Sequence, residues 1–229
     1  MDVEEEEVAG NSNITTTTTN TPHNKTKDDK SKHLKYSNCV YTSCYCEENV
    51  WQLCKQIQKD NPTQLSECYV VFISNKNRQV PLWMQKSAKD PLTPVVWDYH
   101  VILVQKPAQG KPSEPSQGKP LVYDLDSLLA FPCLLEDYIH QAIQSENSMK
   151  KQYHRRFRVV EAAMFLETFA SDRSHMRLPN GQYQKPPPDY PAIRTPTEEM
   201  NLDQFIDMSP GFHGRVKDLK GLIAMFLLP

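Results

Sequence analysis

The sequence contains few glycines and no long hydrophobic run. Only 7 of its 229 residues are glycine, and no glycine-rich loop precedes a predicted helix, which excludes the common phosphate-binding motifs. The longest apolar run is segment 222–228, far shorter than the roughly 20 residues that cross a bilayer. The first residues lack a basic stretch followed by an apolar one, so we expect no secretory signal.

An excess of positive charge is also absent. The 26 Lys and Arg residues face 28 Asp and Glu residues, for a net charge of −2, so we expect neither a nucleic-acid partner nor a membrane. Without an export signal, the 6 cysteines are expected to be reduced thiols in the cytoplasm or nucleus. A hydrophobic content of 38% is sufficient for a core and excludes a wholly disordered chain.

Composition divides the chain into an extension and one domain. Residues 1–35 carry an acidic start and a threonine run but few aliphatic side chains, which predicts a disordered extension. Residues 36–229 are predicted to form a single domain. Within it, segment 105–120 holds four prolines and two glycines and predicts a mobile loop. Segment 217–229 is an apolar tail. We expect it either to pack as a final helix or to depart from the native sequence.

Hydrophobic periodicity predicts the order of helices and strands. The pattern predicts a helix over 46–57 that ends at Asn61-Pro62, strands over 68–74, 80–84, 95–104 and 121–126, a helix interrupted near Pro132 within 127–144, and a short helix over 201–206 capped by Asn201. Segment 157–170 fits either one helix or a strand followed by a helix. The strands on either side of segment 105–120 are predicted to pair as a hairpin.

Cys46 is the first candidate for chemistry. It lies where the helix of 46–57 begins, and a helix N-terminus stabilises the nucleophilic thiolate form of cysteine. The adjacent Glu47 and Glu48 oppose this effect, because their negative charge raises the pKa of a thiol. The alternative interpretation is a buried structural thiol.

His100 is the candidate base. In a strand over 95–104, period-two alternation places Asp98 and His100 on one face, and pairing with the next strand brings Asp124 or Asp126 near the imidazole. A carboxylate there would orient His100 while its other nitrogen serves the thiol. Spacing alone leaves Asp98, Asp124 and Asp126 as alternatives, and an ordinary surface hairpin remains possible.

Two other groups of side chains are weaker candidates. Four cysteines lie within sixteen residues, but Cys44 and Cys46 are spaced too tightly for a usual zinc site, so we expect no metal and no cofactor. His175 lies in a polar cluster and is an alternative base or, more simply, part of an ordinary loop.

Several strings in the sequence resemble motifs of the protein N-terminal glutamine amidohydrolase family. The resemblance runs from about Cys39 to about Pro210 and rests on motifs in the family's order. These are YTSCYCEENVW (41–51), VVFISN (70–75), PLW (81–83), VWDYHV (96–101), YDLD (123–126), FPC (131–133), FASDRSHM (169–176), PPPDYP (186–191) and MNL (200–202). The tail 217–229 is not recognised as part of this pattern.

The resemblance implies both a fold and a reaction. The implied fold is a compact α/β (α+β) domain, a sheet flanked by helices with a transglutaminase- or papain-like core. The implied triad is Cys46 as nucleophile, His100 as base and Asp124 as the orienting acid. The family converts an N-terminal glutamine of peptides and proteins to glutamate with release of ammonia, which feeds the arginylation branch of the N-degron pathway. No metal or cofactor is implied, and we expect a monomer.

Recognition of a free N-terminus requires further residues. An acid near Cys46 would bind the α-ammonium group, so Glu47 and Asp98 are the candidates, with Ser43 and Trp97 completing the pocket. Two other functions use the same residues. A cysteine peptidase or acyltransferase would act on other amides, and a non-catalytic reader would bind N-termini without turnover.

Overall fold

The structure is a computed structural model that describes residues 34–107 and 118–228. The predicted extension 1–35 lies almost wholly outside these residues, as does most of the predicted loop 105–120. The described residues all belong to one compact unit. The described residues therefore fall almost wholly within the predicted domain 36–229.

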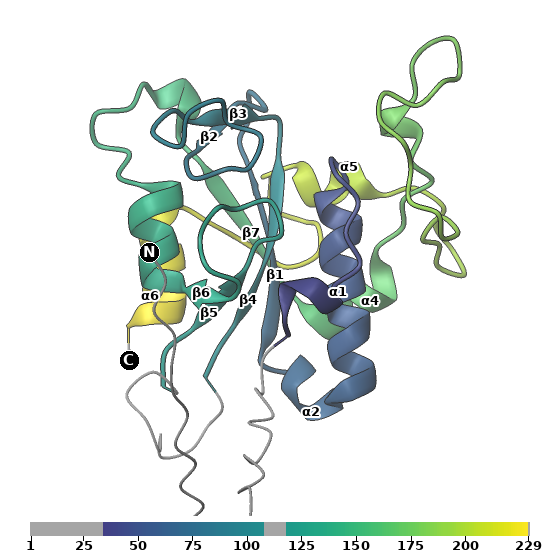
Figure 1. The fold of residues 1–229 in the computed structure, drawn as a ribbon, viewed down its shortest axis with the longest axis horizontal. Coiled ribbons are helices and arrows are strands. Elements are labelled where there is room, and N and C mark those ends of the chain that lie inside the picture. The colour runs from purple at the N-terminus through teal and green to yellow at the C-terminus, as the bar shows by residue number, and fades with distance from the viewer. Residues whose placement is uncertain (1–33, 108–117, 229) are drawn as a thin grey trace, which may run out of the picture. The chain divides into compact units, whose positions relative to one another are not determined.

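A six-stranded antiparallel sheet forms the centre of the domain (Figure 1). Its strands, in spatial order, are β6 (Cys133–Leu134), β5 (Leu121–Tyr123), β4 (His100–Gln105), β1 (Cys68–Ser74), β7 (Arg156–Glu161) and β8 (Arg215–Lys217). A separate two-stranded sheet pairs β2 (Val80–Leu82) with β3 (Val95–Trp97). Every strand pair is antiparallel, which makes the fold α+β and agrees with the predicted mixture of helices and strands.

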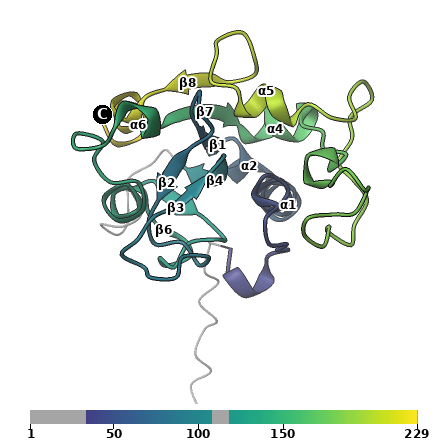
Figure 2. The same ribbon diagram turned by 90° about the horizontal axis from the view of Figure 1, so that it is seen from above.

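Helices cover both faces of the sheet (Figures 1 and 2). One face carries α1 (Cys46–Asp60), α2 (Pro62–Leu65), α4 (Ala162–Thr168) and α5 (Leu202–Ile206). The other carries α3 (Leu135–Tyr138), which continues into the π-helix η2 (Ile139–Ile143), and α6 (Leu219–Leu227). The 3-10 turns are η1 (Tyr36–Asn38), η3 (Lys151–Tyr153) and η4 (Ser174–Met176). No helix within the described ranges combines the length and hydropathy needed to traverse a membrane.

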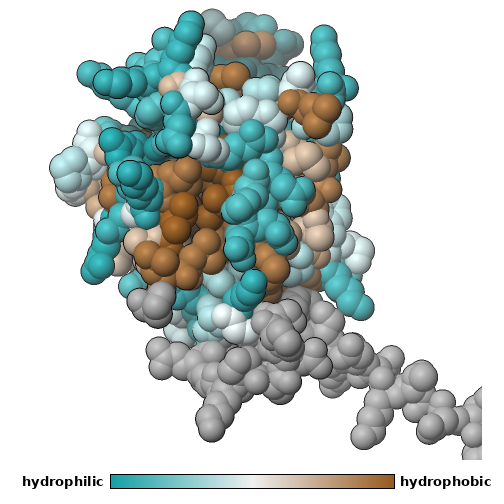
Figure 3. Space-filling model, turned by 90° about the vertical axis from the view of Figure 1, so that its left-hand side faces the viewer, coloured by the Kyte–Doolittle hydropathy of each residue, from teal (hydrophilic) through white to brown (hydrophobic). Residues whose placement is uncertain are grey.

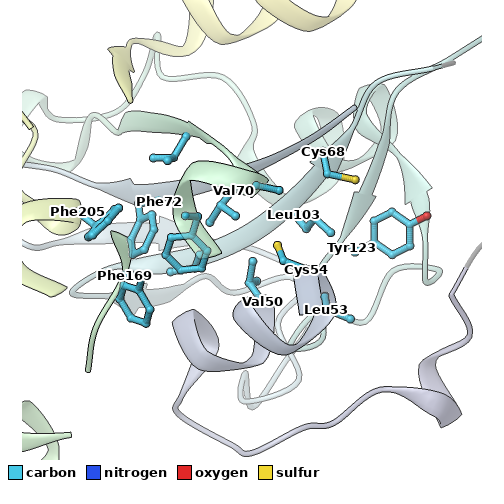
Figure 4. Packing of buried hydrophobic residues seen from close by; sticks show 14 of the residues in the cluster. Val50, Leu53, Cys54, Cys68, Val70, Phe72, Leu103, Tyr123, Phe169 and Phe205 are labelled. Carbon is cyan, nitrogen blue, oxygen red and sulfur yellow. The ribbon is translucent and has the colours of Figure 1, made fainter. Parts of the chain in front are cut away.

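Strand alternation divides the core into two clusters, one on each face. Val70 and Phe72 of β1 point toward α1, whereas Val71 and Ile73 point toward α3 and α6. Figure 4 shows the first cluster, where Val50, Leu53 and Cys54 of α1 face the sheet. At the other end of the same cluster, Phe72, Phe169 and Phe205 gather into an aromatic group. This packing fixes the position of α1 on the sheet.

Several predicted elements are confirmed. The strand over 68–74 is β1, and the helix predicted from Cys46 is α1, which ends at Asp60 immediately before Pro62 begins α2. The predicted hairpin is formed by β4 and β5. Segment 157–170 is resolved as strand β7 followed by helix α4.

The predicted single strand 95–104 is wrong, because it bends at Asp98 and Tyr99. The Asp98 carboxylate accepts the Tyr99 backbone N–H at 3.0 Å, and the Asp98 carbonyl accepts the Ser74 hydroxyl at 2.9 Å. These bonds compete with the strand ladder, so β3 and β4 enter different sheets. The predicted strand 121–126 likewise ends early at Tyr123, because Asp124 accepts the Asp126 backbone N–H at 2.9 Å.

Two helix predictions also require correction. Asn201 precedes α5 but does not cap it, since its side chain binds the Thr168 carbonyl at 2.7 Å and the Ala170 N–H at 2.9 Å. It thereby connects the end of α4 to the start of α5. The helical part of 127–144 begins only at Leu135, because the chain beyond Pro132 first forms the short strand β6 beside β5.

The tail packs as a helix against the sheet. Asp218 caps α6 by accepting the Gly221 N–H at 2.7 Å, and Leu222 and Phe226 are buried in the second core cluster. Other apolar residues of α6 are only partly buried: Leu219, Ile223, Met225 and Leu227. Figure 3 shows this side of the molecule, where apolar side chains (brown) gather between hydrophilic ones (teal).

We predict that α6 is required for stability. Replacing Leu222, which has no exposed surface, by Ala should lower the free energy of unfolding by about 2–5 kcal/mol, because it leaves a cavity. The matched Leu228→Ala variant, at a residue that is 61% exposed, should change it by less than about 0.5 kcal/mol. Denaturant unfolding measures both, and equal effects would contradict the docked helix.

Candidate active site

The chain enters α1 through a short, tightly bonded segment. Asn49 holds it by accepting the Thr42 N–H at 2.8 Å and donating to the Thr42 carbonyl at 2.9 Å. Cys44 adopts a left-handed backbone with φ of 69°, which turns the chain into the helix. Cys46 is the first residue of α1 and is partly buried. Its thiol is therefore presented from a rigid helix N-terminus.

His100 and Asp124 form a buried pair at the open end of the β4–β5 hairpin. The two atoms His100 Nε2 and Asp124 Oδ1 are 3.0 Å apart, and Asp124 Oδ2 accepts the Tyr138 hydroxyl at 2.8 Å. Burial favours the neutral carboxyl, but the charge of His100 and these bonds outweigh it and lower the pKa of Asp124. Burial likewise opposes a charged His100, yet Asp124 raises the pKa of that imidazole.

Trp97 restrains the imidazole from another direction. Its ring stacks on that of His100 with centroids 5.6 Å apart and planes inclined by 19°. Its indole N–H donates to Gln85 Oε1 at 3.2 Å, which fixes the orientation of the tryptophan. Nδ1 of His100 is buried and has no hydrogen-bond partner among the described residues. This nitrogen is consequently available for a reacting group.

Cys46 and His100 line the same cavity of about 430 Å³. Residues from seven separate stretches of the chain line it, so it lies where the sheet, the start of α1, the long segment before α5 and α5 itself meet. The lining residues are Cys44, Cys46, Arg78, Trp97, Asp98, Tyr99, His100, Asp126, His175, Met176, Gln184, Lys185, Leu202, Asp203 and Ile206. A larger groove of about 960 Å³ lies between η2 and α6, and no cysteine lines it.

The environment of Cys46 favours the protonated thiol. Burial raises its pKa most, followed by the charge of Glu47, while the Val101 backbone N–H acts in the opposite direction. The helix N-terminus was expected to favour the thiolate, and burial together with Glu47 outweighs that effect. Ionisation of Cys46 therefore requires a base or a compensating positive charge.

The four residues expected to form the substrate pocket, two of them as candidate partners of the α-ammonium group, lie in different places. Trp97 and Asp98 line the cavity, and Asp98 is exposed. Ser43 is exposed and does not line it. Glu47 is fully buried behind the cavity wall, where it accepts the Tyr99 hydroxyl at 2.9 Å. Asp98 is thus the acid of this group that faces the cavity.

A buried ion pair connects α1 to a distant segment of the chain. Arg173 Nε and Nη2 each donate to a different carboxylate oxygen of Glu48 at 2.9 Å, a bidentate arrangement. The remaining donors of Arg173 bind the carbonyls of Pro188 at 3.1 Å and Tyr190 at 3.0 Å. This pair brings His175 and the segment 184–190 to the start of α1.

Some cavity residues were not predicted from the sequence. Arg78 and Asp203 form an exposed ion pair of 2.7 Å at the cavity, and Gln184 and Lys185 complete the lining. These residues come from loops and from α5, and no local pattern marks them. His175, in contrast, was considered as an alternative base from its place in the motif FASDRSHM, and it does line the cavity.

Three ligand atoms near the cavity could together bind a metal ion. They belong to His100, Asp124 and Asp126 and lie within 4.8 Å of one another. Protein donors already occupy the carboxylates, since Asp126 accepts the Tyr41 hydroxyl at 2.6 Å and Asp124 binds Tyr138. A cation would have to displace these bonds, so the donor set fits a hydrogen-bonded network better than a metal centre.

Comparison with known proteins decides the family. A sequence model described as N-terminal glutamine amidase matches residues 41–226, most of the chain. The chain belongs to this family. The matched range includes Cys46, His100, Asp124 and nearly all of α6, so the tail that the motifs left unrecognised is largely part of the family domain.

Curated relatives carry the family's activity in their names. A protein N-terminal glutamine amidohydrolase of Danio rerio is 47% identical over 189 residues, which cover 82% of this chain and 89% of the relative. The Homo sapiens protein of that name is 46% identical over 172 residues, covering 75% and 80%. The Drosophila melanogaster protein is 44% identical over 177 residues, covering 77% and 82%. Membership of this family makes the chain a hydrolase of amide bonds.

We predict that the Glu48–Arg173 pair is essential to the folded domain. Glu48→Gln should lower the free energy of unfolding by roughly 3 kcal/mol or more, because it leaves a buried guanidinium without its counter-charge. The control is Glu199→Gln, whose partner Arg194 lies 2.7 Å away at the surface, and it should cost about 1 kcal/mol or less. A small effect at Glu48 in denaturant unfolding would contradict this role.

Proposed function

We propose that this chain hydrolyses the side-chain amide of an N-terminal glutamine in peptides and proteins, yielding glutamate and ammonia. The names of its relatives and of its family support this activity. The observation that supports it most directly is that Cys46 and His100 line one cavity. A thiol near an imidazole oriented by a carboxylate is suited to nucleophilic attack on an amide.

The proposed reaction begins with proton transfer from the Cys46 thiol to Nδ1 of His100, while Asp124 holds Nε2. The thiolate then attacks the carbonyl carbon of the glutamine side chain. The free backbone N–H groups in the first turn of α1 stabilise the oxyanion that forms. Each of these roles falls to a group held in place by secondary structure or by a buried hydrogen bond.

The intermediate then collapses and is hydrolysed. His100 donates the proton to the leaving nitrogen, which departs as ammonia and leaves a thioester on Cys46. A water molecule that gives its proton to His100 attacks the thioester, releases the glutamate side chain and restores the thiol. These steps use only groups of the chain and water.

We also propose to which group of enzymes the core is related and which pathway uses the product. A cysteine at a helix start, a histidine on a strand and an aspartate after the next strand are the parts of papain-like and transglutaminase-like enzymes, and we assign the core to that group. We further propose that the glutamate product enters the arginylation branch of the N-degron pathway. The enzyme would act as a monomer in the cytoplasm and nucleus.

Asp98 is the proposed partner of the substrate's α-ammonium group. It lines the cavity with Cys46, and its carboxylate is fixed by the Tyr99 backbone N–H at 3.0 Å. A carboxylate held in this way pairs with the positive charge of a free α-ammonium group, which acetylation removes. Trp97 would form the adjacent wall of the pocket.

The reaction is tested with three matched peptides that begin with Gln, Asn or acetyl-Gln. We expect ammonia release and the mass gain of an amide-to-acid conversion only for the free Gln peptide. Cys46→Ala should reduce turnover by about 10³-fold or more, whereas Cys39→Ala, at another partly buried cysteine that does not line the cavity, should not. Cleaved backbone or amine-linked product would indicate a peptidase or acyltransferase, and binding without turnover a reader.

The Asp98 assignment has its own test. Asp98→Asn should raise KM for the free Gln peptide by about tenfold or more with a smaller change in kcat, because it removes a charge-assisted hydrogen bond. The control is Asp137→Asn, an exposed residue of α3. An unchanged KM for Asp98→Asn in steady-state assays would exclude this residue as the ammonium partner.

A further inference from the structure

Glu47 is fully buried, and one of its carboxylate oxygens has no hydrogen-bond partner among the described residues. Oε2 accepts the Tyr99 hydroxyl at 2.9 Å, and the Cys46 thiol lies 3.7 Å from the same oxygen. Oε1 has no donor. A buried carboxylate is unfavourable unless donors or a positive charge compensate it. Glu47 therefore requires a compensating group beside Oε1.

His175 is the group in that position. Its Nε2 lies 3.4 Å from Glu47 Oε1 without hydrogen-bond geometry, and within the described residues neither ring nitrogen has another partner. Arg173 cannot serve, because its guanidinium is bound to Glu48. A small adjustment of the imidazole would convert the contact into a charge-assisted hydrogen bond. His175 and Glu47 thus form a second histidine–carboxylate pair beside the cavity.

The charged groups around Cys46 show why this pair matters. Carboxylates approach from three segments: Glu47 on α1, Asp98 at the β3–β4 bend and Asp126 after β5. Of the other titratable groups here, Tyr99 donates to Glu47, and His100 is held by Asp124. His175 is the basic side chain that contacts the carboxylate nearest the thiol, and Asp172 is the other acid close to it.

We propose that His175 is a positioning residue for Cys46. By donating from Nε2 to Oε1 of Glu47 it holds that carboxylate against Tyr99 and reduces the negative charge that opposes ionisation of the Cys46 thiol. The inference rests on the proposed function for the role of Cys46 as nucleophile. Its physical consequence, however, is the reactivity of the thiol toward any electrophile, so it can be tested without a glutamine substrate.

The test measures alkylation of Cys46 by iodoacetamide as a function of pH, with site-resolved mass spectrometry on the full chain. His175→Gln should slow alkylation at neutral pH by about tenfold, the effect of about one unit in the thiol pKa. The difference from wild type should disappear at sufficiently alkaline pH, because the Cys46 thiol is then ionised in both proteins. A change in packing alone would not produce this pH dependence.

Substitution of Glu47 provides the opposite prediction. Glu47→Gln should accelerate alkylation, and adding His175→Gln to it should have no further effect, because no carboxylate remains to be balanced. His140→Gln, at an exposed residue of η2, is the matched control. Equal slowing by His175→Gln in both backgrounds, or none in either, would overturn the proposal. Retention of the predicted alkylation pattern without glutamine deamidation would leave the inference intact and reject the proposed function.

Discussion

The ion pair between Glu48 and Arg173 is the contact on which the arrangement of the site depends. It joins residues 125 positions apart and is buried, so each charge requires the other. Since Glu48 lies in the first turn of α1, the pair fixes the helix end that carries Cys46. Because Arg173 also binds the carbonyls of Pro188 and Tyr190, the same contact holds this later segment of the chain against the start of α1.

Two aspartates, Asp98 and Asp124, interrupt strands on the His100 side of the site. Asp98 bends the chain between β3 and β4, and Asp124 ends β5, and in both cases the carboxylate captures a nearby backbone N–H. Each aspartate thereby leaves the regular ladder and gains a second role. Asp98 faces the cavity, and Asp124 binds His100. Residues that are unfavourable in strands are thus placed where the regular structure gives way to the site.

Local sequence patterns predict much of this structure, because a strand or helix that is buried on the core must carry apolar residues at regular spacing. The apolar run 68–74 and the periodicity that starts at Cys46 predict β1 and α1. Residue type and order along the chain select Cys46 and His100 as candidates. Spacing could not choose the partner of His100 among the aspartates, because that choice depends on where the strands end. The approach of Arg173 and His175 to α1 is a tertiary contact over long sequence separation, which no local pattern reports.

The β4–β5 hairpin places the His100–Asp124 pair at the end opposite to the connection between its strands. His100 begins β4 and Asp124 follows β5, so the pair lies at one end of the ladder, whereas the connection leaves from Gln105 and returns at Leu121 at the other. The ladder pairs between them set the spacing of His100 and Asp124 regardless of what joins the strands. Insertions and deletions in that connection can therefore accumulate during evolution, and a label could be introduced there, without altering the geometry of the pair.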